Sequence, residues 1–155
     1  MGLGGVELVM EIEECFRVGI SDAEAQKIST PGEICEFLAG TWIGYQPVGC
    51  LSMSVFHRVR RALELPARAG PDAALPCAAP PRFPGLRGPR QKVRTVGELV
   101  LELVARNYGR LSETESVWNP KEVWRSVQLI VADMVRVAPG RVRRDALLVD
   151  DLGLE

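Results

Sequence analysis

The sequence of 155 residues lacks several features that point to common kinds of site or location. It has one histidine, and its four cysteines form no Cys-x-x-Cys pair, so a zinc site is not expected. No basic region followed by an apolar run opens it, and no apolar stretch approaches the roughly 18 residues of a membrane span. A reduced, cytoplasmic protein without membrane contact is therefore expected.

Groups that could carry out catalysis are also scarce. Cys50 and His57 are seven residues apart and could share a helix face. A Cys–His nucleophile also needs a third group to orient the histidine, and none is evident. No catalytic residue is therefore predicted, and the chain is not expected to be an enzyme. Cys15 and Cys35 lie beside apolar residues at helical spacing and are predicted to be core residues.

What the chain does have is a strong separation of charge behind a net charge of −1. Residues 1–40 carry eight acids and two bases, whereas residues 41–94 carry nine bases and two acids. Such a division predicts either attraction between the two parts or two different partners.

The basic part continues into a proline-rich segment, with seven prolines between Pro66 and Pro89. Proline cannot sustain helix hydrogen bonds, so residues 66–94 are predicted to be a Pro/Arg-rich linker that buries little. Its arginines predict a solvated linker that could lie against the acidic N-terminal helix. Binding of nucleic acid or an anionic surface is the alternative. It is disfavoured because Phe83 is the only aromatic residue in the segment.

The first helix is predicted to carry an apolar stripe beside an acidic strip. Glu7, Glu11 and Glu14 are four and three residues apart, and Glu13 lies nearby. Like charges at those spacings repel by a few tenths of a kcal/mol per pair, so such a helix has stability to spare or meets a basic partner. These four glutamates are the predicted contacts with a basic surface on a partner protein. The apolar stripe is predicted to contain Leu3, Val6, Val9, Met10 and Phe16.

Further helices follow, so the predicted fold class is all-α. Three begin at capping signals, in which a side-chain oxygen and an acid three positions later satisfy free backbone N–H groups. These signals are Thr30 with Glu33, Thr95 with Glu98 and Asn119 with Glu122. Four further helices are predicted, from Thr30 to about Gly40, Leu51 to Leu65, Thr95 to about Gly109 and Asn119 to about Pro139. A short helical segment is predicted after Ser21 or Asp22, and a polar link from Ser112 to Ser116.

Two segments near the N-terminus carry a family resemblance. They are VELVMEIEECF at residues 6–16 and DAEAQKISTPGE at residues 22–33, and they resemble the second to fourth helices of an acyl carrier protein. The resemblance implies a serine that carries 4′-phosphopantetheine at the start of the acidic helix. Gly2 or Gly5 occupies that position, and no serine precedes Ser21. A carrier-like fold without its cofactor is therefore expected. The alternative is an active carrier completed by a partner that supplies the serine.

The C-terminal region carries the rest of the resemblance. Residues 123–137, the loop with Arg143–Leu148 and the Asp-Leu-Gly-Leu-Glu run at 151–155 resemble helix one and the following loop of the same family. Helix one would thus be placed last, in a permuted bundle. Residues 30–34 also match 95–99, and 55–59 match 123–127, which indicates a degenerate repeat. The predicted parts are 1–40 (helices two to four), 41–65 (helix-one-like), 66–94 (linker), 95–109 (helix-four-like) and 117–155 (helix one and loop).

The two carrier-like parts are expected to need each other, because about 40 residues rarely build an adequate core alone. Residues 117–155 are therefore predicted to pack on 1–40, within one chain or by exchange in a helix-swapped dimer. The resemblance implies a non-catalytic module that acts by protein–protein contacts in or beside acyl-thioester metabolism of the fatty-acid or polyketide type. The predicted contacts join Trp124, Val127, Ile130, Val131 and Met134 to Val6, Val9, Met10, Phe16, Ile34 and Phe37.

Overall fold

The computed structural model describes residues 2–41, 49–76, 80–115 and 117–154. Within these ranges the regular structure is helical, so the predicted all-α fold class is confirmed. None of these helices combines the length and apolar character that a membrane span requires. The elements are α1 (Leu3–Phe16), α2 (Asp22–Ala25), α3 (Pro31–Thr41), α4 (Leu51–Ala62), α5 (Val96–Glu115), α6 (Pro120–Val135) and the 3₁₀ turn η1 (Pro139–Arg141).

Local capping chemistry sets the starts of α3 and α5. The backbone N–H of Glu33 donates to the hydroxyl of Thr30 (3.3 Å), and the N–H of Thr30 donates to the Glu33 carboxylate (3.0 Å). Thr95 and Glu98 form the same pair of bonds, at 3.2 and 3.3 Å. Both predicted capping boxes are confirmed.

The third capping signal is only half formed, because Glu122 caps a different helix. The Asn119 side chain accepts from the first turn of α6 as expected. The Glu122 carboxylate instead accepts from the N–H groups of Leu51 (3.1 Å) and Ser52 (2.9 Å). The first N–H groups of a helix have no partner within it, so a residue of α6 supplies the cap of α4.

The predicted end of α5 is wrong. The helix passes Gly109 and the expected polar link, and continues to Glu115 with a kink at Asn107 (φ −131°, ψ 20°). Gly109 marks a helix crossing: a Cβ built there would lie 2.1 Å from the backbone oxygen of Phe16 in α1. α4, by contrast, is shorter than predicted: it ends at Ala62, three residues before the predicted end at Leu65. The expected helix end at residues 42–48 lies outside the described residues.

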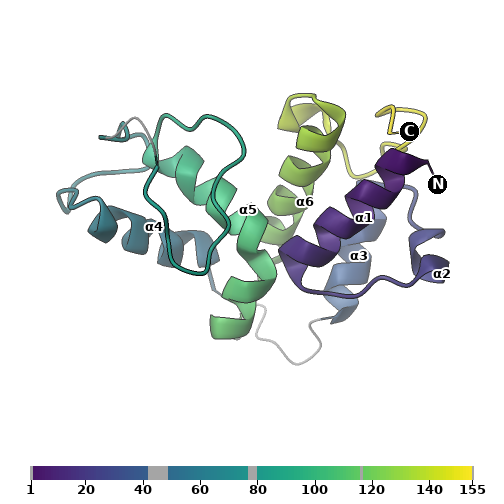
Figure 1. Cartoon of the computed structure of the whole chain (residues 1–155), viewed down its shortest axis with the longest axis horizontal. Coiled ribbons are helices and arrows are strands. Elements are labelled where there is room, and N and C mark those ends of the chain that lie inside the picture. The colour runs from purple at the N-terminus through teal and green to yellow at the C-terminus, as the bar shows by residue number, and fades with distance from the viewer. Residues whose placement is uncertain (1, 42–48, 77–79, 116, 155) are drawn as a thin grey trace.

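The buried side chains of the helices form one continuous core, and Figure 1 shows the arrangement of the helices that contribute to it. α6 packs against α1 and α3, and also against α5, which in turn contacts α1 and α4. The C-terminal helix and the first 40 residues thus share a core within this chain. α6 packs on α3 and α4 packs on α5, which are the two helix pairs that the predicted sequence repeat would relate.

The buried face of α1 differs from the predicted stripe. Leu3, Val6 and Met10 of the predicted stripe are 78%, 48% and 61% exposed, so the predicted packing of Val6 and Met10 on α6 is wrong. The actual buried face includes a glutamate because α5 and the proline-rich segment cover a side of α1 that the sequence pattern assigns to solvent. It consists of Gly5, Leu8, Glu11, Ile12, Cys15 and Phe16. Burial of Cys15 and Cys35 is confirmed.

The described part of residues 66–94 has no fully buried residue, but several of its apolar side chains are half-buried against the helices. Leu75, Phe83 and Leu86 pack against the core, and the N–H of Leu75 donates to the carbonyl of Arg94 (2.9 Å). Proline prevents helix hydrogen bonds, yet it does not prevent apolar side chains from docking on neighbouring helices. The described part of this segment therefore lies against the outside of the core.

Candidate functional site

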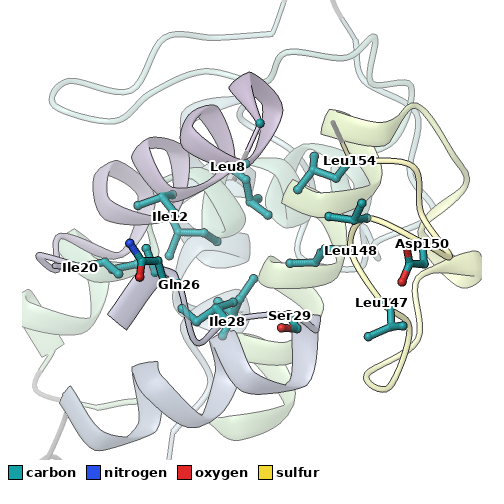
Figure 2. Close-up of a pocket in the computed structure, with 16 residues that line it drawn as sticks. Leu8, Ile12, Ile20, Gln26, Ile28, Ser29, Leu147, Leu148, Asp150 and Leu154 are labelled. Carbon is teal, nitrogen blue, oxygen red and sulfur yellow. The ribbon is translucent and has the colours of Figure 1, made fainter. Parts of the chain in front are cut away.

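An apolar cavity of about 340 Å³ lies between α1, the residues around α2 and the tail after α6 (Figure 2). This volume falls at the lower end of the range for small-molecule sites. Leu8 and Ile12 extend into it from α1, with Leu148 and Leu154 of the tail on the facing side. The remaining lining residues are Gly2, Gly5, Val9, Ile20, Ala25, Gln26, Ile28, Ser29, Ile34, Leu147, Val149 and Asp150.

The tail is held by two backbone hydrogen bonds, one to the loop before α3 and one to the first turn of α3. The N–H of Leu148 donates to the carbonyl of Ser29, and the N–H of Gly32 donates to the carbonyl of Arg144, each at 2.9 Å. A Cβ at residue 32 would lie 2.9 Å from that Arg144 oxygen, so glycine permits the close approach. The Arg144 guanidinium also lies over the ring of Trp124, 4.8 Å from its centroid. The tail is thus a fixed wall of the cavity.

The cavity lining is almost uncharged. Of the described residues around it, Asp150 alone carries a charge, and it is exposed. Gln26 and Ser29 supply the polar side chains, and both are exposed. The interior therefore suits an apolar group without charge, because an anion would find no cation in this lining.

Gly2 and Gly5 both line this cavity, at the start of α1. Gly2 is the N-cap residue and provides no side-chain capping bond, while Gly5 is buried. These are the two positions where the family resemblance calls for a serine. Neither has an oxygen that could accept a phosphopantetheine group.

The four predicted partner-binding glutamates do not share one environment. Glu7 and Glu14 are exposed, and Glu14 lies 3.4 Å from Arg87. Glu13 is half-buried and accepts a hydrogen bond from the N–H of Ile20 (2.8 Å). Glu11 is only 7% exposed, so its prediction as a partner contact is wrong.

Glu11 is enclosed by cations of its own chain. Its carboxylate lies 2.7 Å from Arg90, 3.1 Å from Arg106 and 3.4 Å from Arg87. The Cys15 thiol donates to it at 3.3 Å. Burial favours a raised pKa for Glu11, but the Cys15 hydrogen bond and the charges of Arg87 and Arg90 together lower its pKa below the ordinary value. Glu11 is therefore a buried anion.

Arg106 links Glu11 to two more carboxylates, one on α5 and one on α6. Its side chain is 6% exposed and lies 3.3 Å from Glu102 and 3.1 Å from Asp133. We call Glu11, Arg87, Arg90, Glu102, Arg106 and Asp133 the ion-pair cluster; it joins α1, α5, α6 and the proline-rich segment. Arg87 and Arg90 thus lie against the acidic helix. Because both are paired with Glu11 there, they are not available to bind nucleic acid.

Cys50 and His57 are not brought together as a nucleophile and a base. The Cys50 thiol donates to Glu122 (3.2 Å), whereas exposed His57 meets the ring of Phe56 edge-on (5.7 Å). Within the described ranges, no group of three or more His, Cys, Asp or Glu side chains is placed to hold a metal ion. No protein-family model matches the chain, and no solved structure matches it.

Proposed function

We propose that this protein is an acyl-carrier-protein-like module without a phosphopantetheine arm. It receives an apolar acyl chain in its cavity and acts without catalysis, through protein contacts, in or beside acyl-thioester metabolism. The observation that carries this proposal is the position of the cavity. It lies where α1 meets the C-terminal tail, between the two segments that resemble a carrier, with Gly2 and Gly5 in its wall.

The cavity has the size and polarity for such a chain. A volume of about 340 Å³ corresponds to on the order of ten water-sized groups, at about 30 Å³ each. Each methylene group transferred from water to this lining contributes about 0.8 kcal/mol. A chain of that length gains enough from burial to bind reversibly, and its polar head would lie near Ser29 or Gln26 at the exposed edge.

Protein contacts are assigned to the exposed side of α1. Leu3, Val6 and Met10 are about half exposed or more, and Glu7 and Glu14 flank them. We call these five residues the docking face. An exposed apolar stripe bordered by acids fits a partner that presents apolar side chains bordered by bases.

Chain binding is tested with the neutral fluorophore N-phenyl-1-naphthylamine, titrated into the protein and then displaced by methyl decanoate. Ile28 lines the cavity and is half-buried, so Ile28→Trp fills the space with limited disturbance to the core. We expect this variant to bind at least about tenfold more weakly, the equivalent of roughly 1.4 kcal/mol. Leu63→Trp, at a half-buried position outside the cavity, is the matched control and should bind like the wild type. Absence of binding by the wild-type protein would refute the proposal.

The missing arm is tested by intact mass after co-expression with a phosphopantetheinyl transferase. The expected wild-type mass is unchanged, because no hydroxyl is present at residues 2 and 5. Gly2→Ser and Gly5→Ser separately restore a hydroxyl at each position. A mass increase in the wild-type protein would favour an active carrier and contradict an armless module.

A further inference from the structure

We infer that the docking face of α1 binds α4 of a second copy of this chain, so that copies associate head to tail. This pairing rests on the proposed function, because it assigns a partner to the docking face named there. It draws on two helix surfaces that lie on either side of α5 in one chain (Figure 1). The two surfaces must therefore come from different copies to meet.

Apolar side chains and acids alternate along the first surface, which ends with an acid. Leu3 is 78% exposed, and Met10 is 61% exposed. Residues 3, 7, 10 and 14 follow helical spacing, so Glu7 lies between these two apolar side chains and Glu14 follows them. A stripe of this kind keeps apolar surface in water unless a partner covers it.

The second surface, on α4, begins with an apolar side chain and continues with cations. Leu51, Val55 and Val59 are buried, which leaves the other side of the helix open. Met53 near its start is 54% exposed, and Arg58 and Arg61 follow as exposed cations.

A neighbouring arginine of α4 is already engaged within the chain. Arg60 donates to the carbonyl of Ala67 (2.8 Å) and lies over the ring of Phe56. His57 is exposed on the same side as Met53, since four residues separate them. The docking surface of α4 is therefore Met53, His57, Arg58 and Arg61.

A parallel alignment of α1 and α4 matches both the apolar and the charged parts. Met53 would face the apolar start of the docking face, while Arg58 and Arg61 would face Glu7 and Glu14, the second of which also lies 3.4 Å from Arg87 of its own chain. Packing α1 against α1, or α4 against α4, would instead oppose like charges, which disfavours a symmetric dimer through either helix. Because each copy carries both surfaces, two copies close as a two-fold dimer where both α1–α4 contacts form at once, and otherwise the assemblies form a ring or grow with concentration.

The test is sedimentation of the full chain over a wide concentration range. At about 50 mM salt the mean mass should exceed that of the monomer and rise with concentration. At about 500 mM salt the association constant should fall on the order of tenfold, because exposed charge pairs are screened. A wild-type protein that stays monomeric at low salt and high concentration overturns the inference.

Two charge-reversed variants locate the contact. The α1 variant combines Glu7→Lys with Met10→Lys, and the α4 variant combines Arg58→Glu with Arg61→Glu. Each should be monomeric alone, and a mixture should associate again because the intact α4 of one meets the intact α1 of the other. Glu36→Lys adds the same charge as Glu7→Lys at an exposed position on α3, and it should associate like the wild type.

Other results separate this inference from the proposed function. An α4 variant that still associates alone places the contact elsewhere and overturns the head-to-tail pairing. A monomeric wild-type protein that still binds the fluorophore refutes the pairing and leaves the proposed function intact. Failure to bind the fluorophore refutes the proposed function itself.

Discussion

The side-chain amide of Asn107 holds both backbone polar groups of Arg87. Its oxygen accepts from the Arg87 N–H at 2.7 Å, and its nitrogen donates to the Arg87 carbonyl at 2.9 Å. Asn107 is the residue at which α5 kinks. The guanidinium of Arg87 then reaches both Glu11 and Glu14 on α1, each at 3.4 Å. Asn107, at the kink of α5, therefore holds Arg87 in the position from which it pairs with α1.

Replacing Asn107 with alanine should release the proline-rich segment. Two backbone groups of Arg87 lose their partner, so we expect Asn107→Ala to lower the free energy of unfolding by about 2 kcal/mol. Gln91→Ala is the matched control, since it removes an exposed hydrogen bond to Asp133 and should change stability by less than about 0.5 kcal/mol. Urea denaturation measures both. Equal effects would mean that Asn107 does not position the segment.

The ion-pair cluster predicts a strong effect of removing one charge. Glu11→Ala leaves Arg106 buried with one partner fewer, and we expect a loss of about 3–5 kcal/mol of unfolding free energy. Glu113→Ala removes an exposed ion pair with Arg17 and should cost less than about 1 kcal/mol.

The double variant Glu11→Leu with Arg106→Met removes the two central charges together. It should be less destabilising than the sum of its single variants. Additive losses in thermal or urea unfolding would show that the two side chains act independently.

The lowered pKa of Glu11 predicts how stability depends on pH. In the unfolded chain this carboxyl takes up a proton near its ordinary pKa of 4.5, whereas in the folded chain it does so only at lower pH. The stability that its charge contributes is therefore present above pH 4.5 and is lost as pH falls through the lower, folded pKa. The stability difference between wild type and Glu11→Gln should be largest near pH 7 and shrink below pH 4.5. A difference that does not vary between pH 3 and pH 7 would contradict this assignment.

Two glycines provide a matched pair of substitutions. In Gly109→Ala the new methyl would lie 2.1 Å from the Phe16 carbonyl oxygen, so α1 and α5 must separate, and we expect a loss of at least about 2 kcal/mol. Gly40 is helical and exposed in α3, and a Cβ there would meet no atom within 4 Å. Gly40→Ala should therefore stabilise the protein by about 0.4–1 kcal/mol, measured as an increase in Tm. Destabilisation by both would argue against a specific contact at Gly109.

The parts of the fold that depend on nearby residues were predictable from the sequence. Thr30 with Glu33, and Thr95 with Glu98, form their caps within one helical turn, so their spacing suffices. Glu122 has the same spacing from Asn119, yet it caps α4, about 70 residues earlier. That bond depends on how α4 and α6 pack, which a spacing rule does not contain.

The faces of α1 could not be assigned from periodicity, because apolar residues occur on more than one side of it. Met10 follows the predicted stripe but is exposed, while Glu11 is buried because Arg106 and the proline-rich segment neutralise it. The cavity was missed for a related reason. Its lining includes Ile20, Ile28 and Leu148, which lie in loops where no helical period marks them. The feature of the sequence that could have indicated the cavity is the presence of these apolar residues in predicted loops.

The two backbone hydrogen bonds that hold the tail, one to the loop before α3 and one to its first turn, also allow detachment of the cavity wall to be measured. The amide hydrogens of Leu148 and Gly32 are both engaged in these bonds, so each can exchange with solvent deuterium only when the wall detaches. Their exchange rates therefore record how often the cavity opens. Any molecule that fills it would slow the labelling of these two sites before it changes the global melting temperature.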